Sequence, residues 1–321
     1  MKTNVEEFVL AYEELKDHMK WKVTDKQILM MIASIYVLNQ KPLQIERLLN
    51  LSEKIKQQAS LFSPLRSYSR FTTAAVLDVN FDHPEEKIQE LNDVYELFRK
   101  VKFSSGTFTY IAATILLTSG GNETSETIQK AKVIYDGMKK EHSFLTSSSD
   151  YPLATLLAIE SQPDIISRIE VFYEELSRNG LRKGNDLQFL SHILALGKGI
   201  DNKVLMNRAI DIIDSFKHTP LKMKSMYYPI MGMLALLPAK EFSVDSIVSI
   251  YEELNKQKEF KWHKDMNFMV SASMFVNEKM GNNQLAEASL STIVEAVLQA
   301  QQAVMIATIA AVSASSANSG N

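Results

Sequence analysis

The four residues Tyr173-Glu174-Glu175-Leu176 show the pattern that decides the fold of this chain. An apolar or aromatic residue is followed by two mostly acidic or polar positions and then by a second apolar residue. The same pattern occurs at Tyr12–Leu15, Ser52–Ile55, Tyr95–Phe98, Tyr135–Met138, Ile213–Phe216 and Tyr251–Leu254. Successive copies begin 40, 43, 40, 38, 40 and 38 residues apart. A repeat of this length is typical of a solenoid, in which each unit buries its apolar face against its neighbours.

Each repeat is predicted to hold two helices. Around the quoted residues, Ile169, Phe172 and Leu176 recur at three- and four-residue steps, which places them on one stripe of a helix. Gly180 suits the end of that helix, and a second apolar helix with the small residue Ser191 near its middle follows. We interpret the second helices as the more buried row. Because no segment alternates with period two, we predict an all-α fold, an α-solenoid of about seven antiparallel helical hairpins with a C-terminal helix.

The repeats also define the domain boundaries. Residues 1–281 are predicted to form the solenoid, residues 285–312 an alanine-rich C-terminal helix, and residues 313–321 a flexible tail. The C-terminal helix is expected either to cap the array or to associate with a second copy in a homodimer. Both alternatives use one alanine stripe, formed by Ala296, Ala300, Ala303, Ala307 and Ala311.

Composition limits the class of protein. With 45% hydrophobic residues, 23% charged residues and a net charge of -3, the chain is typical of a soluble globular protein. The mildly acidic balance argues against wholesale binding to nucleic acid or to an anionic membrane and leaves a local basic patch open. The absence of cysteine excludes disulfides and thiolate sites and indicates a reducing compartment. No apolar run approaches the roughly twenty residues needed to cross a bilayer, and no signal peptide is visible. We therefore expect a cytoplasmic protein without a membrane span.

No catalytic or ligand-binding signature emerges from the sequence. No two of the six histidines lie three or four residues apart, as a zinc site on one helix face would require. Adjacent glutamates such as Glu174 and Glu175 diverge by about 100° on a helix, so we interpret them as a solvated face. His192, within an apolar helix, is expected to be a hydrogen-bonded structural histidine rather than a ligand or a base. We predict no catalytic residue, cofactor or metal ligand.

The loop between the two helices of most repeats is basic. Equivalent loops of a solenoid lie along one edge, so the sequence predicts a basic rim on a mildly acidic protein. Cations near helix C-termini also offset the helix macrodipole, and this alternative stays open. The candidate rim residues are Lys20, Lys22, Arg66, Lys100, Lys102, Lys139, Lys140, Arg182, Lys183, Lys222, Lys224, Lys261 and Lys264.

The same loops carry apolar residues that we expect to act as anchors. Trp21 and Trp262, the two tryptophans of the chain, fall in the first and last repeats. They are predicted to plug the ends of the core; the alternative is that they are exposed and bind a partner.

Two resemblances follow from particular segments. Residues 169–199 resemble a hairpin of the pentatricopeptide or tetratricopeptide type. Over nearly the whole chain, the sequence resembles an uncharacterised all-helical family, a domain of unknown function, of Gram-positive bacteria. The segments that carry this second resemblance are Arg70–Ala75, Ser149–Ala154 and Gln299–Ala303. It implies a bacterial cytoplasmic protein with no assigned activity, and it transfers no site residue to this chain.

These observations favour a non-enzymatic interaction scaffold that binds a protein or peptide on its helical-repeat surface. One alternative is a protein that binds nucleic acid or another polyanion through the basic rim. A second alternative is an enzyme of unknown type with a pocket in the concave face. Whether the chain is an enzyme is left open, with a non-enzymatic function preferred.

Overall fold

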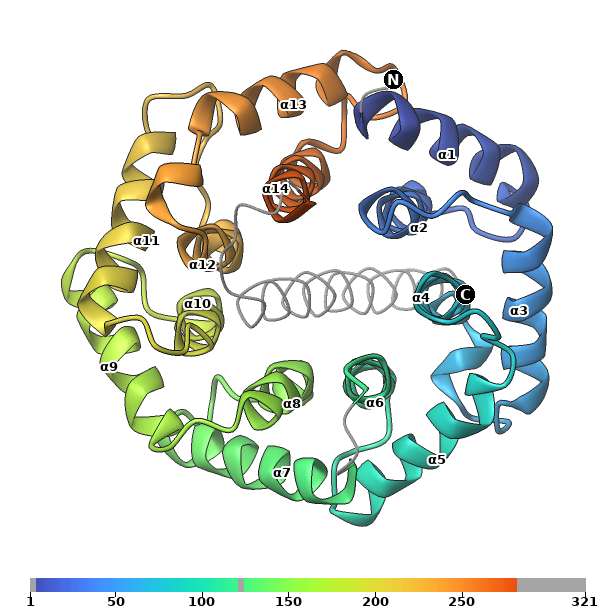
Figure 1. The fold of residues 1–321 in the computed structure, drawn as a ribbon, viewed down its shortest axis with the longest axis horizontal. Helices are drawn as coiled ribbons and strands as arrows, with labels where there is room; N and C mark the ends of the chain where they lie inside the picture. The colour runs from blue at the N-terminus through green and yellow to red at the C-terminus, as the bar shows by residue number, and fades with distance from the viewer. Residues whose placement is uncertain (1–3, 121–123, 282–321) are drawn as a thin grey trace, which may run out of the picture. The chain divides into compact units, whose positions relative to one another are not determined.

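Helices form all the regular secondary structure of residues 4–120 and 124–281, which are the residues that the computed structural model describes (Figure 1). The predicted all-α class is therefore confirmed for this part of the chain. The described residues belong to two compact units, residues 4–120 and residues 124–281, which we call unit 1 and unit 2. The predicted C-terminal helix, the tail and the alanine stripe lie outside the described residues.

Unit 1 contains six helices that pack in consecutive pairs. They are α1 (Asn4–Met19), α2 (Lys26–Leu38), α3 (Ile45–Gln58), α4 (Ser69–Asn80), α5 (Lys87–Lys100) and α6 (Thr107–Thr118). Helices α1 and α2, α3 and α4, and α5 and α6 pack against each other as hairpins. In Figure 1 the first helices, α1, α3 and α5, form one row, and the second helices form another row alongside it.

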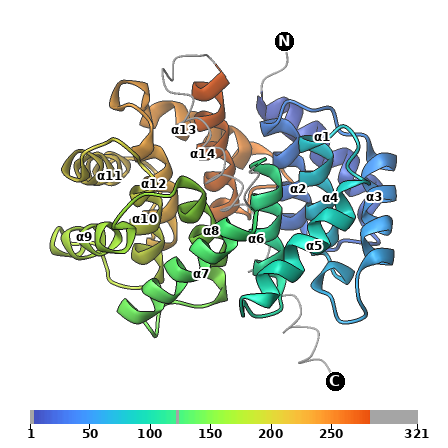
Figure 2. The same ribbon diagram turned by 60° about the horizontal axis from the view of Figure 1, so that its bottom comes forward.

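Unit 2 repeats this arrangement with four pairs. Its helices are α7 (Thr124–Glu141), α8 (Tyr151–Glu160), α9 (Ile165–Arg178), α10 (Asn185–Ala195), α11 (Asn202–Phe216), α12 (Tyr228–Leu236), α13 (Val244–Lys256) and α14 (Lys264–Gly281). Short 3-10 helices precede α8 and α12, at Ser148–Asp150 and Ser225–Tyr227. Figure 2 shows α9 and α11 next to each other, with α10 and α12 packed together behind them.

The repeated pattern marks the buried stripe of every first helix. Its fourth position is fully buried in all seven copies, at Leu15, Ile55, Phe98, Met138, Leu176, Phe216 and Leu254. The two middle positions are half-buried or exposed throughout. The glutamates of the pattern therefore form a solvated face, as the sequence predicts.

The second helices form the more buried row, and small residues allow their close approach. The small side chains near their middles, including Ala33, Ala74, Ala112 and Ser191, are all buried. Gly232 in α12 shows the reason most directly. A Cβ atom built on it would lie 2.8 Å from Leu190 Cδ1 and 3.1 Å from Ile193 Cγ2, both in α10. A hydrogen atom at position 232 is thus what allows α10 and α12 to touch.

We expect Gly232→Val to lower the free energy of unfolding by about 1–3 kcal/mol, because the added methyl groups would overpack the contact between α10 and α12. Urea unfolding followed by circular dichroism measures this change. Gly180→Ala is the matched control for loss of a glycine, since nothing lies within 4 Å of a Cβ at that position. That control is strained for a separate reason, the positive φ of +93°. A Gly232→Val protein as stable as the parent would show that the two helices are less tightly packed.

Candidate interaction surface

The loops inside the hairpins form the surface that the sequence singled out. We call these loops, with the residues at the adjoining helix ends, the loop rim. They cover residues 20–25, 59–68 and 101–106 in unit 1, and residues 142–150, 179–184, 217–227 and 257–263 in unit 2.

Hydrogen bonds connect two loops of unit 2, residues 179–184 and 217–227, to the starts of neighbouring second helices. The Arg182 backbone amide donates to the Tyr228 hydroxyl over 3.4 Å. The Ser225 hydroxyl donates to the Asp186 carboxylate over 2.6 Å. The Lys224 ammonium donates to Asp265 over 2.6 Å. Because these bonds each join adjacent hairpins, the loops lie side by side along one edge of the unit.

Unit 1 has a corresponding bond, in which the Ser63 hydroxyl donates to the Tyr110 hydroxyl at the start of α6 over 3.3 Å. The connections between hairpins lie at the other end of the second helices. There the Gln162 amide donates to the carbonyl of Ala195 at the end of α10 over 3.1 Å. Each unit thus has a loop rim along one edge and the inter-hairpin connections along the opposite edge.

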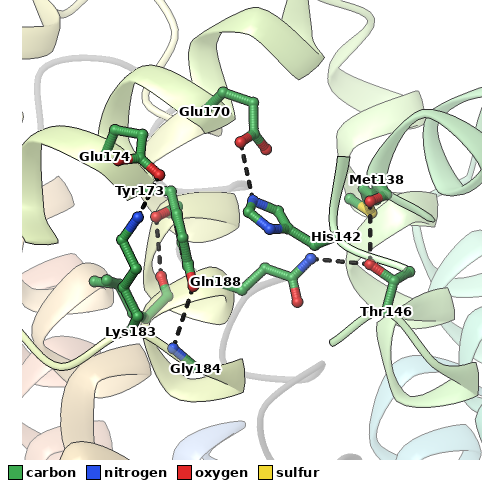
Figure 3. A network of polar contacts seen from close by, with 11 residues as sticks. Met138, His142, Thr146, Glu170, Tyr173, Glu174, Lys183, Gly184 and Gln188 are labelled. Atoms are coloured by element: carbon green, nitrogen blue, oxygen red, sulfur yellow. Dashed lines mark hydrogen bonds and ion pairs between the residues drawn. The ribbon is translucent and has the colours of Figure 1, made fainter. Parts of the chain in front are cut away.

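A buried polar network supports the rim between α7, α9 and α10 (Figure 3). The fully buried Gln188 donates its side-chain amide to the Thr146 hydroxyl over 3.0 Å. Thr146 donates in turn to the Met138 carbonyl over 3.2 Å, and this bond closes the loop after α7. His142 Nε2 lies 2.9 Å from Glu170 Oε2 in α9. These contacts fix the loop after α7 against the next hairpin.

The neighbouring loop is fixed in the same region (Figure 3). The Gly184 backbone amide donates to the Tyr173 hydroxyl over 3.2 Å. Lys183 donates to Glu174 over 2.7 Å, and its ammonium lies 5.5 Å from the centroid of the Tyr173 ring. Lys183 is therefore held at the surface by α9, the first helix of its own hairpin.

All thirteen candidate rim cations are exposed. The macrodipole alternative covers three of them, because Lys100, Lys139 and Lys140 lie in the last turns of α5 and α7. Most of the others lie beyond the helix ends, and Lys264 is the first residue of α14, where the dipole is unfavourable to a cation. The macrodipole alternative therefore applies to Lys100, Lys139 and Lys140 and not to Lys264.

The expected plugging of the core by the two tryptophans is wrong. Trp21 is 88% exposed and Trp262 is 81% exposed. The buried positions of those loops are taken by Val23 and Phe260, each 1% exposed. Residues two positions away thus fill the core in place of the tryptophans.

The sequence reasoning did not single out two further exposed aromatics on the rim. Phe62 is 93% exposed and Phe144 is 101% exposed. In the first of these loops the buried residue is Leu65, and in the second it is Thr146. The sequence did contain a signal for these exposed aromatics. It is a loop with more apolar residues than one core position can hold. Both loops contain such a pair, Phe62 with Leu65 and Phe144 with Leu145.

The histidine within the apolar helix differs from expectation. His192 is fully buried, and neither ring nitrogen has a hydrogen-bond partner among the described residues. Its Nδ1 lies 3.8 Å from Asp150 Oδ1, too far for a hydrogen bond. Burial lowers the pKa of His192 to about 3, with a smaller contribution from His142. Burial also raises the pKa of Asp150 to about 6, although the Ser147 amide opposes this shift. The expectation of a hydrogen-bonded histidine is therefore wrong.

Three grooves in the described part recur at equivalent positions of the repeat. Each lies between the first helix of a hairpin and the connection to the next hairpin. Their volumes are about 700 Å³ beside α1, 340 Å³ beside α3 and 590 Å³ beside α7. The same helix position, two residues before the pattern, is Leu10, Asn50 and Val133 in the three grooves. Because this chemistry differs, repeat geometry explains the grooves better than a common ligand does.

The described residues contain neither a metal-binding cluster nor a membrane-spanning helix. No group of three or more His, Cys, Asp or Glu side chains in residues 4–120 and 124–281 is placed to hold a metal ion. Over the same residues, no helix has the length and apolar character to span a membrane.

Comparisons with known proteins identify the family of this chain. The chain is 38% identical over 304 residues to YeaA, an uncharacterized protein of Bacillus subtilis (strain 168). The aligned region covers 94% of this chain and 92% of that protein. No solved structure matches the chain. Residues 11–303 match the family described as protein of unknown function (DUF4003). The expected resemblance to an uncharacterised helical family is thereby confirmed, and the chain belongs to the DUF4003 family.

Proposed function

We propose that this protein is an interaction scaffold, an α-solenoid of helical hairpins that binds an anionic partner along the loop rim. The pairwise packing of consecutive helices and the two rows within each unit support the solenoid. A scaffold of this kind requires an extended surface with repeated contact points, which stacked hairpins provide.

The observation that carries this proposal is the meeting of exposed cations and exposed aromatics on the same loops. Lys20 and Lys22 flank Trp21, and the Lys261 ammonium lies 5.1 Å from the centroid of the Trp262 ring. Tryptophan is enriched among the residues that carry most of the binding energy of interfaces, and clustered cations attract an anionic partner. The net charge of -3 makes this concentration of positive charge a local property of the rim.

Among the carboxylates at the starts of the second helices, Asp265 pairs with the rim cation Lys224, and others accept from amides and hydroxyls of the protein. Asp25 accepts from the Gln27 amide over 2.9 Å, and Asp150 accepts from the Ser147 amide over 2.9 Å. Asp186 and Asp265 accept from Ser225 and Lys224, as described above. A partner at the rim would therefore meet cations and aromatics.

A salt-dependence measurement tests the proposal with heparin fragments as the polyanionic probe. We expect a rim variant of unit 2 to show a slope of log K against log salt that is smaller by about one for each cation removed. Its four substitutions are Lys139→Gln, Lys140→Gln, Lys222→Gln and Lys261→Gln. The matched control removes four off-rim cations of the same unit, by Lys130→Gln, Lys198→Gln, Lys203→Gln and Lys240→Gln.

The control has the same net charge as the rim variant, so the two differ only in where the charge is removed. Equal losses in both proteins would contradict the proposal, as would a parent protein that does not bind heparin at low salt. Circular dichroism of each variant verifies that the helices are retained.

A further inference from the structure

The most exposed large apolar side chains of the described residues all lie on the loop rim. They are Phe144, Phe62, Trp21, Trp262 and Leu61, with exposed fractions of 101%, 93%, 88%, 81% and 72%. We call these five side chains the rim tips. Unit 1 contributes Trp21, Leu61 and Phe62, and unit 2 contributes Phe144 and Trp262. Each unit therefore has its own apolar tips.

The opposite edge lacks this feature in the part of the chain that is described. Its connections, residues 39–44, 81–86, 161–164, 197–201 and 237–243, include no exposed large apolar side chain. The apolar residues there, such as Leu43 and Phe81, are half-buried. Between the two edges, exposure of large apolar side chains is thus a property of the rim and does not follow from loop structure in general, although first helices also expose some, such as Val133 on α7.

The tips lie on four separate loops, with Leu61 and Phe62 sharing one, and polar or cationic residues occur beside them. Trp21 lies between Lys20 and Lys22, and Phe62 follows Leu61 in a loop that continues to Arg66. A folded protein partner would need a separate pocket for every such tip. A lipid bilayer needs none, because its interface accepts apolar side chains at any lateral position.

We propose that the rim of each unit docks on the surface of an anionic lipid bilayer. In this arrangement the rim tips enter the interfacial layer, where tryptophan is favoured because its ring is apolar and its indole N–H is polar. The neighbouring lysines reach the anionic headgroups through their flexible stems. This inference rests on the proposed function, the binding of an anionic partner along the loop rim, and it identifies that partner as a lipid bilayer.

The two tryptophans provide a reporter for each unit. Trp262→Phe leaves Trp21 as the reporter of unit 1, and Trp21→Phe leaves Trp262 as the reporter of unit 2. The experiment mixes each full-length single-tryptophan protein with vesicles of phosphatidylcholine alone or with roughly one-third phosphatidylserine. We expect a blue shift of emission, and quenching by brominated lipid chains, with the anionic vesicles.

Substitutions on and off the rim test where contact occurs. We expect Leu61→Ser with Phe62→Ser to weaken vesicle binding by about tenfold or more, because two large side chains lose apolar burial. Each of Lys20→Gln and Lys22→Gln is expected to weaken it by about fivefold. The matched control is Val133→Ser on α7, which removes a side chain that is 71% exposed away from the rim. That control should bind as the parent does.

The outcomes separate this inference from the proposed function. Rim-dependent vesicle binding with lipid quenching of tryptophan supports docking on a bilayer. Binding of heparin, poly-glutamate or an oligonucleotide through the rim, without vesicle binding, overturns bilayer docking and leaves the rim as a binding surface for another partner. Binding to none of these probes overturns both. Vesicle binding that Val133→Ser weakens as much as the rim substitutions also overturns the inference.

Discussion

Replacing Asp78 by alanine is expected to lower the free energy of unfolding of unit 1 by about 2–3 kcal/mol, because it removes a buried carboxylate that accepts from the buried Tyr36 hydroxyl and from the partly exposed Arg47. Asp78 in α4 is 2% exposed. Its Oδ2 accepts from the Tyr36 hydroxyl of α2 over 2.6 Å, and its Oδ1 accepts from Arg47 Nε of α3 over 2.5 Å. Burial, and then the bond to Asp78, raise the pKa of the Tyr36 phenol above its ordinary value, so Tyr36 stays a donor.

The loss is large because three helices meet at this carboxylate. Alanine would leave the buried Tyr36 hydroxyl without its acceptor and would separate Arg47 from its counter-charge. Hydrogen exchange read by mass spectrometry localises the effect to α2, α3 and α4, and urea unfolding gives its size. These two measurements are needed together, since two compact units need not unfold in one step.

Three further proteins define the origin of the loss. Asp78→Asn keeps the shape and an acceptor oxygen, so it should lose less stability than Asp78→Ala. Tyr36→Phe combined with Asp78→Ala should cost less than the sum of the single changes, because the hydroxyl and its acceptor disappear together. Asp82→Ala should change little, since Arg47 contacts only the backbone carbonyl there. An Asp78→Ala protein as stable as Asp82→Ala would contradict the assigned contact.

The second large expected effect is on the pH dependence of stability. Replacing Asp150 by asparagine should make the protein lose stability on acidification, by about 1.4 kcal/mol per pH unit relative to the parent, between about pH 6 and pH 4. Urea unfolding of both proteins at several pH values across this interval measures the difference in slope.

The sign follows from proton binding in the two states. The lowered pKa of His192, about 3 against 6.5 for a free histidine, means that between these values only the unfolded state binds that proton. Stability therefore falls as pH falls. The raised pKa of Asp150, about 6 against 3.8, means that between these values only the folded state binds that proton. Stability therefore rises as pH falls. In the parent protein the two effects oppose each other, and Asp150→Asn leaves the histidine effect alone.

The reverse substitution is the control for this interpretation. His192→Asn removes the histidine and leaves Asp150, so its stability should rise as pH falls from about 6 to 4 relative to the parent. Parallel curves of stability against pH for the parent and Asp150→Asn would contradict the interpretation, because they would show that Asp150 binds no proton in the folded state between about pH 6 and pH 4. The change in stability with pH is measured for each protein relative to its own stability at neutral pH, so a packing cost of either substitution does not affect the comparison.

Features that depend on periodicity were predictable from the sequence. The fourth position of the pattern is buried in every copy, from Leu15 to Leu254, because one stripe of each first helix must face the core. The row of small residues was predictable for a related reason, since only small side chains permit close helix contact. The edge on which the basic loops lie follows from the same repetition.

Contacts that depend on side-chain geometry between hairpins were not predictable. Tyr36 and Asp78 are 42 residues apart, about one repeat, and neither stands out in the sequence. Trp21 and Val23 are both apolar, and the turn after α1 decides that Val23 enters the core. His192 was expected to have a partner, yet the groups that pack around it are set by three segments of unit 2. One repeat pattern cannot specify such neighbours.

The division of the exposed tips between two units affects binding strength. In the proposed docking, the tips and cations of each unit make a separate contact with the bilayer. Because both units belong to one chain, attachment of one rim keeps the other at a high effective concentration near the same surface. The overall binding constant then depends on the product of the contributions of the two contacts. A change that weakens each rim slightly would therefore release the whole protein, which makes its attachment steeply sensitive to surface charge and to salt.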